Sequence, residues 1–94
     1  MSAKIEIPSP LQKFVGNQTT VEVTGGTIQE VFSNLISQYG DLRNHLYDEE
    51  GRIRSFINIY LNDEDIRYAS NLETQVAQGD IIQIVPSIAG GLKG

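Results

Sequence analysis

A single amphipathic helix is the element that most restricts how this chain can fold. Its start is marked by Thr27 with Glu30 three residues later, which is the pattern of a capping box. The apolar side chains that follow recur with helical spacing and lie on one stripe: Ile28, Val31, Phe32, Leu35, Ile36 and Tyr39. Gly40 stands where a left-handed C-cap residue is expected. Such a stripe must be buried against another element, so the segments around the helix decide the fold class.

Five segments around this helix show strand patterns. Residues 4–7 and 19–24 precede it and alternate apolar and polar side chains, as residues 56–61 do after it. Residues 66–68 are predicted to form a short edge strand. Residues 81–85 are almost all β-branched, which favours a buried central strand. The predicted core-facing positions are Ile5, Ile7, Val21, Val23, Ile57, Ile59, Leu61, Ile82 and Ile84.

The remaining segments complete an α+β fold. Residues 41–47 are expected to form a short second helix, residues 71–74 one helical turn, and residues 11–14 an extended or irregular loop. Leu72 and Val76 should fill the core. A hairpin, one long helix and then more strands predict a mixed sheet with one main helix packed across one face. With the first and last strands parallel at its centre, this arrangement is the β-grasp, or ubiquitin-like, fold.

Length, charge and composition exclude several functions. The 94 residues fit one domain, and the absence of cysteine excludes a thiolate nucleophile and Cys-type metal sites. A net charge of −5 argues against a nucleic-acid partner, because phosphate contacts need clustered Lys and Arg. No apolar run reaches transmembrane length and the N-terminus lacks a signal-peptide pattern, so a cytoplasmic protein that does not bind membranes is expected.

No residues with catalytic or ligand spacing are evident, so the chain is not expected to be an enzyme or to hold a metal or cofactor of its own. His45, the one histidine, is interpreted as a surface residue. The carboxylates of residues 62–65 lack the spacing of a calcium loop and are interpreted as a solvated turn. Gly25 and Gly26 precede the helix without the Lys-Ser/Thr of a phosphate-binding loop, so they predict an ordinary loop.

Regular structure is expected to end soon after the predicted central strand. Pro86 cannot donate to a ladder, so strand pairing should stop there, with residues 1–86 as the β-grasp domain and residues 87–94 as a flexible tail. Gly90 and Gly91 lack a Cβ, and such a backbone can pass through a slot too narrow for any side chain. Chain ends are often disordered without a functional reason, so the tail gains meaning only from the rest of the chain.

Taken together, these segments resemble the ThiS/MoaD family of sulfur-carrier proteins. The resemblance covers nearly the whole domain and rests on residues 56–67, Gly79-Asp80 and the stretch Pro86-Ser87-Ile88-Ala89-Gly90-Gly91. These stretches are similar to the branch that carries sulfur for cysteine biosynthesis. The alternatives are a ubiquitin-like modifier of lysines, a sulfur carrier for molybdopterin or thiamine, and an interaction module with an inert tail.

The resemblance implies a protein that other enzymes act upon, with Gly91 as its reactive end. An ATP-using enzyme of the ubiquitin-E1 type would adenylate the Gly91 carboxylate, and a sulfur donor would displace AMP to leave a thiocarboxylate. A PLP-dependent cysteine synthase would use this group on an activated serine, and a JAMM-type zinc peptidase would cut the resulting carrier–cysteine amide. ATP, PLP and zinc would thus belong to the partners. Ile88, Ala89 and Gly90 would form the slim tail that enters the activating enzyme.

Three residues follow the diglycine, whereas members of this family usually end there. Gly91 therefore has no free carboxylate, and the bond between Gly91 and Leu92 is the predicted processing site, cut by a JAMM-type peptidase. Two alternatives stay open. In the first, Leu92-Lys93-Gly94 are an artificial addition to the natural chain. In the second, Gly94 itself is activated, but the side chain of Lys93 is bulky for a glycine-lined tunnel.

The sheet face opposite the helix is the predicted docking surface for these partners. If Ile82 and Ile84 point inward, the residues that alternate with them point outward, and the same rule applies to the strand at residues 56–61. The predicted apolar patch consists of Phe56, Tyr60, Ile81 and Val85. The alternative is that residues 11–14 or a second copy of the chain cover it.

Overall fold

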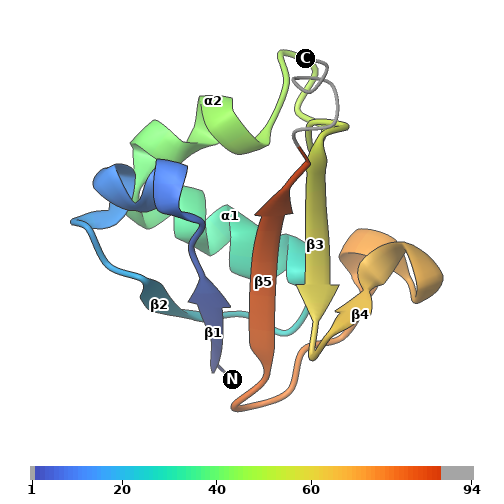
Figure 1. Cartoon of the computed structure of the whole chain (residues 1–94). Coiled ribbons are helices and arrows are strands. Elements are labelled where there is room, and N and C mark those ends of the chain that lie inside the picture. Colours follow the sequence, from blue (N-terminus) through green and yellow to red (C-terminus); the bar gives the residue numbers. More distant parts are fainter. Residues whose placement is uncertain (1, 88–94) are drawn as a thin grey trace.

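The computed structural model describes residues 2–87, which form a five-stranded sheet with α1 packed across one face (Figure 1). The elements, in which η marks a 3-10 helix, follow in the order β1 (Ser2–Glu6), η1 (Ser9–Val15), β2 (Thr20–Thr24), α1 (Ile28–Gln38), η2 (Gly40–Leu42), α2 (Arg43–Leu46), β3 (Ile57–Leu61), β4 (Glu64–Asp65), η3 (Ile66–Tyr68), η4 (Asn71–Glu73) and β5 (Ile81–Pro86). The strand order is β2-β1-β5-β3-β4. This mixed sheet with one long helix across it confirms the predicted β-grasp fold.

The first and last strands lie side by side at the centre of the sheet, as predicted. β1 and β5 are parallel, with Ile5 opposite Ile82, whereas β2 pairs with β1 and β3 with β5 in the antiparallel sense. In Figure 1 the red β5 runs between the blue β1 and the yellow β3. β5 therefore has a neighbour along both edges, and it buries Ile82 and Ile84 on one face.

α1 begins at the predicted capping box. Thr27 Oγ1 accepts a hydrogen bond from the backbone N–H of Glu30 (3.2 Å), and the Glu30 carboxylate accepts one from the backbone N–H of Gly26 (2.8 Å). The prediction of a left-handed C-cap at Gly40 is wrong: the helix is capped by Tyr39 with φ −128°, and Gly40 opens η2 without a positive φ. Because a 3-10 turn follows at once, the chain needs no left-handed reversal there.

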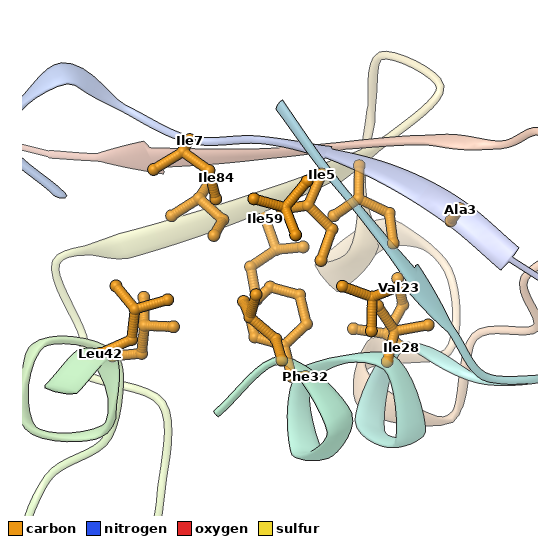
Figure 2. Close-up of a cluster of buried hydrophobic side chains, with 14 of the residues drawn as sticks. Ala3, Ile5, Ile7, Val23, Ile28, Phe32, Leu42, Ile59 and Ile84 are labelled. Carbon is orange, nitrogen blue, oxygen red and sulfur yellow. The ribbon is translucent and has the colours of Figure 1, made fainter. Parts of the chain in front are cut away.

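The core fills the space between the sheet and α1, where Phe32 reaches toward Ile59 of β3 (Figure 2). The helical stripe is fully buried at four positions, Ile28, Val31, Phe32 and Leu35, and partly buried at Ile36 and Tyr39. Every predicted strand position is buried except Leu61, which packs against the core while partly exposed. The remaining buried apolar side chains are Ala3, Leu11, Val15, Leu42, Leu46, Ile66 and Val76, and Leu72 packs beside them.

Residues 11–14 form part of a 3-10 helix, and the prediction of an extended or irregular segment is wrong there. Pro10 lies in the first turn of η1, where its fixed φ favours helical backbone and its missing N–H costs nothing. Leu11 and Val15 lie four residues apart and both reach the core. Gly16 ends η1 with a φ of 68°, a left-handed conformation that favours glycine.

The interpretation of residues 62–65 as a solvated turn is wrong at its last residue. Asn62 and Asp63 do form a tight turn between β3 and β4, with φ values of 51° and 73°. Asp65, however, is only 7% exposed and accepts a hydrogen bond from the backbone N–H of Arg67 (2.9 Å). This cap starts η3, so residues 66–68 form a 3-10 turn and the prediction of an edge strand there is wrong; the edge strand is β4, which lies just before them.

Candidate functional site

The end of β5 is where the sheet connects to the C-terminal residues. Pro86 lies opposite Ile57, and the backbone N–H of Ser87 donates to the carbonyl of Phe56, so strand pairing continues one residue beyond the predicted stop. The reason is the antiparallel pattern, in which hydrogen-bonded and non-hydrogen-bonded pairs alternate. Pro86 occupies a non-hydrogen-bonded position, so β3 never requires the N–H that proline lacks.

The residues that are predicted from the sequence to be reactive come directly after Ser87. Ile88, Ala89, Gly90, Gly91 and Leu92 lie outside the described residues 2–87, so the adenylation site and the processing site remain predictions. The structure fixes the position from which these residues start. Ser87 is bonded to Phe56 at one end of the sheet, one residue before the segment that carries the diglycine.

The sheet face that turns away from α1 carries the predicted apolar patch. Phe56 and Val85 are 47% and 40% exposed, whereas Tyr60 and Ile81 are partly exposed. The alternation is the expected one, because Ile82 and Ile84 are buried and Val85 lies opposite Asn58 on β3. Phe56 immediately precedes β3, so the exposed part of the patch lies beside Ser87. The 11–14 segment does not cover it, because Phe56 and Val85 stay exposed while Leu11 is buried in the core.

The same face becomes polar toward β1 and β2. Lys4 lies opposite Ile81, and Glu6 lies opposite Gln83, whose side-chain amide donates to the Glu6 carboxylate (3.0 Å). On β2 the Glu22 carboxylate accepts from the hydroxyl of Ser2 (2.8 Å). A partner that docks on this face would therefore find apolar side chains on β5 and β3 and charged side chains on β1 and β2.

A groove that was not predicted from the sequence runs along the edge of β3 that faces away from β5. It has a volume of about 460 Å³, and its walls come from the loop after α2, from β3, and from η3 and η4. The apolar floor includes Ile57, Ile66 and Leu72, and three arginines line it: Arg52, Arg54 and Arg67. These residues come from separate segments whose spacing carries no common pattern, so sequence reasoning had no signal for the groove.

Asp65 and Arg67 form a charged pair in the lining of this groove. Nη2 of Arg67 lies 2.7 Å from Oδ2 of Asp65, and Nε lies 3.1 Å and 3.2 Å from the two carboxylate oxygens. The pKa of Asp65 is lowered, chiefly by the hydrogen bond from the Arg67 guanidinium and then by the one from the backbone N–H of Arg67. The pKa of Arg67 is raised by the same contact, and its side chain remains 63% exposed.

Within residues 2–87 there is no cluster of three or more His, Cys, Asp or Glu side chains that could hold a metal ion. His45 is exposed, as predicted, and its ring stacks on Phe14 with a centroid distance of 4.4 Å. In the same part of the chain, no helix has the length and hydropathy needed to cross a membrane.

The fold and the site define a class of protein: a ubiquitin-like β-grasp domain whose central last strand leads into a diglycine segment. The chain belongs to the ThiS family, whose match covers residues 5–91 and so includes both glycines. It is 38% identical over 93 residues to the sulfur carrier protein CysO of Mycobacterium tuberculosis H37Rv, covering 97% of this chain and 100% of that protein. The predicted resemblance to sulfur carriers is confirmed.

Solved structures with a similar fold include a carrier and a modifier. A chain in the crystal structure of the Amycolatopsis orientalis BexX/CysO complex matches with a TM-score of 0.85 and 36% identity, covering 95% of this chain and 99% of that chain. The small archaeal modifier protein SAMP1 of Methanosarcina acetivorans matches with a TM-score of 0.84 and 26% identity over 96% of each chain. The fold is thus similar to that of a carrier and to that of a modifier.

Proposed function

We propose that this protein is a sulfur carrier whose Gly91 carboxylate is converted to a thiocarboxylate, and that the sulfur is used in cysteine biosynthesis. The observation that carries the proposal is the family match over residues 5–91, which ends on the second glycine of the diglycine. The similarity to CysO over nearly the full length supports the cysteine branch over a carrier for thiamine or molybdopterin.

Adenylation overcomes the poor electrophilicity of a carboxylate. A carboxylate oxygen of Gly91 would attack the α-phosphorus of ATP and release pyrophosphate. A sulfur nucleophile would then attack the acyl carbonyl and displace AMP, leaving the thiocarboxylate. The activating enzyme of the ubiquitin-E1 type binds the ATP, so in this scheme the chain is a substrate and needs no cofactor of its own. A PLP-dependent cysteine synthase would consume the product.

The three residues after Gly91 must first be removed in this proposal. While Leu92 follows, the Gly91 carbonyl is part of an amide and offers ATP no carboxylate. A zinc peptidase of the JAMM type suits the cut, because a metal-bound water can attack an amide that glycine leaves sterically open. The partners are therefore an adenylating enzyme, a peptidase and a synthase, all of which must reach the same tail.

These partners are proposed to dock on the apolar patch of Phe56, Tyr60, Ile81 and Val85. Phe56 and Val85 are the most exposed of the four and lie beside Ser87, where the tail begins. An enzyme that covers this patch therefore lies next to the segment on which it acts. Apolar side chains exposed together on a small domain are a typical feature of docking surfaces.

The proposal is tested with a chain that ends at Gly91, incubated with ATP, sulfide and the E1-type adenylating enzyme encoded in the same genome. Intact-mass measurement should show one oxygen replaced by sulfur, located on the C-terminal peptide. Parallel reactions without ATP, and with a chain that ends at Gly90, are the controls and should show no change. Sulfur incorporation that is equal in the Gly90-terminated chain would contradict the assignment of Gly91.

A second function is favoured by the similarity to SAMP1, which is a modifier protein. The same activated Gly91 could be transferred to lysine amines and form isopeptide bonds. The two functions predict different products in the native cell. A modifier leaves branched peptides on other proteins, whereas a carrier leaves a thiocarboxylate on its own C-terminus. Mass spectrometry of both fractions separates them.

A further inference from the structure

The groove along β3 is separated from the apolar patch by the strand itself. β4 pairs only with Tyr60 and Leu61, so the first part of the β3 edge faces the groove instead of another strand. Residues 51–55 form the opposite wall. The floor side chains Ile57 and Ile66 retain 7% and 6% exposure, and Leu72 is partly exposed. The groove can therefore receive an aliphatic side chain.

The charges along the groove differ from those of the chain as a whole. Three arginines and one carboxylate line it, although the net charge of the protein is −5. Arg52 is engaged by Glu50 and Asp48 at the outer end. Arg54 lies between the groove and this acidic turn, but among residues 2–87 it has no ion pair.

Arg54 and Arg67 are both held in place by hydrogen bonds. Nε of Arg54 donates to the backbone carbonyl of Asn44 (2.8 Å). Arg67 is fixed on the buried carboxylate of Asp65, yet 63% of its side chain is exposed. Both side chains are therefore anchored by hydrogen bonds within the chain, and such pre-organisation reduces the entropy cost of binding. Asp65 occupies the Nε–Nη2 edge of Arg67, so a partner's carboxylate would accept from the remaining N–H groups of that guanidinium.

The groove also lies close to the start of the tail. Ser55 lines it, and the next residue, Phe56, accepts the hydrogen bond from Ser87. Ile57 lies between the groove and Pro86, so one strand spacing of about 4.8 Å separates the groove from the end of β5. An enzyme that holds the tail and covers the apolar patch is therefore within reach of the groove.

We infer that this groove is a second docking site for the adenylating enzyme, and that it receives a surface segment carrying an aliphatic side chain beside a carboxylate. The inference rests on the proposed function, since it names the same partner. The aliphatic side chain lies over Ile57, Ile66 and Leu72, and the carboxylate is bound by Arg54 and Arg67. Arginine is over-represented among the residues that dominate interface energies. Two contacts on opposite sides of β3 would fix the orientation in which the tail enters the enzyme.

The test compares substitutions in a chain that ends at Gly91, using ATP–pyrophosphate exchange by the adenylating enzyme of the same genome. Arg54→Glu reverses the charge at the groove. Arg43→Glu is the matched control, because it makes the same change in net charge on α2, outside this groove. Leu72→Gln removes the most exposed of the three aliphatic side chains of the floor without a change in charge. Arg67 is left intact, since its loss would leave the buried Asp65 without a partner.

Arg54→Glu should raise the KM for the carrier at least tenfold and change kcat less than twofold, because a docking contact acts before the chemical step. Arg43→Glu should change KM less than twofold, and Leu72→Gln should raise it several-fold while circular dichroism shows an intact fold. The KM of the wild type should also rise with salt more steeply than that of Arg54→Glu. Equal KM values for Arg54→Glu and Arg43→Glu would overturn the groove assignment. A wild-type chain that supports no exchange would instead overturn the proposed function, and the groove assignment with it.

Discussion

The side chain of Arg67 binds the carboxylate of Asp65 at the point where β4 ends and η3 begins. The backbone N–H of Arg67 donates to the same carboxylate (2.9 Å), so Asp65 is both a helix cap and an ion-pair partner. Asp65 is 7% exposed, and a charge that is buried to this degree is stable only with such partners. The pair thus fixes the end of the edge strand and one wall of the groove.

This pair predicts a loss of stability in acid. The folded-state pKa of Asp65 is lowered, first by the Arg67 guanidinium, relative to an ordinary aspartate value of about 3.9. The stabilisation is therefore complete above that value and is lost as pH falls through the folded-state pKa. In urea unfolding, wild type should be more stable than Asp65→Asn at pH 7, and the difference should shrink at pH 3. A difference that does not change with pH would contradict the assignment.

The core predicts a large effect at Leu35. This side chain has no exposed surface and lies on the buried stripe of α1. Leu35→Ala should lower the free energy of unfolding by about 2–5 kcal/mol, since it removes buried methyl groups and leaves a cavity. Ser33→Ala, at an exposed position of the same helix, is the control and should stay within about 0.5 kcal/mol of wild type. Chemical denaturation midpoints measure both values.

Gly25 is predicted to tolerate no side chain. Its φ is 155°, and a Cβ there would lie 2.7 Å from the backbone nitrogen of Val31. Gly25→Ala should therefore destabilise the domain by about 1–3 kcal/mol through backbone strain. Gly26→Ala is the neighbouring control, because its Cβ would meet only the end of the flexible Glu30 side chain, at 3.3 Å. Thermal unfolding that ranks the two variants in the reverse order would show that the close approach to α1 is not what requires glycine.

The apolar patch predicts a binding defect without a folding defect. Val85 is 40% exposed and Tyr60 is partly exposed, so Val85→Ser and Tyr60→Ala should fold and yet bind the adenylating enzyme more weakly, by tenfold or more. Glu22→Gln, on the polar half of the same face, should bind within about twofold of wild type. Calorimetric titration measures all three. Undiminished binding by the Tyr60 variant would place the docking surface elsewhere.

Maturation is predicted to switch the protein on. A chain that ends at Gly91 and the full 94-residue chain should be compared in ATP–pyrophosphate exchange with the same adenylating enzyme and no peptidase. Only the first should support exchange, because only it presents a carboxylate on Gly91. Added JAMM-type peptidase should restore exchange to the 94-residue chain. Equal exchange by both chains would move the reactive end to Gly94.

Much of the fold was predictable because its signals are local. The capping box of Thr27 and Glu30 and the apolar stripe of α1 lie within one continuous stretch of sequence. The alternation of apolar and polar residues in β3 and β5 sets the buried faces of these strands. The errors occur where a local cue was overridden by a short helix. Residues 66–68 carry a strand-like composition, but the cap at Asp65 turns them into η3.

The site was only partly predictable, for a different reason. The apolar patch follows from the period of two within single strands, so Phe56 and Val85 could be placed on one face from sequence. The groove could not, because Arg54, Arg67 and Leu72 come from three segments that only the tertiary fold brings together. The burial of Asp65 is a different case, because its partners are local: Arg67, two residues later, binds the carboxylate, and Asp65 pairs with Tyr60 on the adjoining strand.

The place of β5 at the centre of the sheet has a mechanical consequence. β5 pairs with β1 along one edge and with β3 along the other, and the tail begins where β5 ends. A force applied to the tail along this axis would load both ladders together, in shear. Strands at a sheet edge can instead be peeled away one hydrogen bond at a time. In the proposed function, an enzyme that pulls on the tail would meet the resistance of both ladders, and the domain would stay folded.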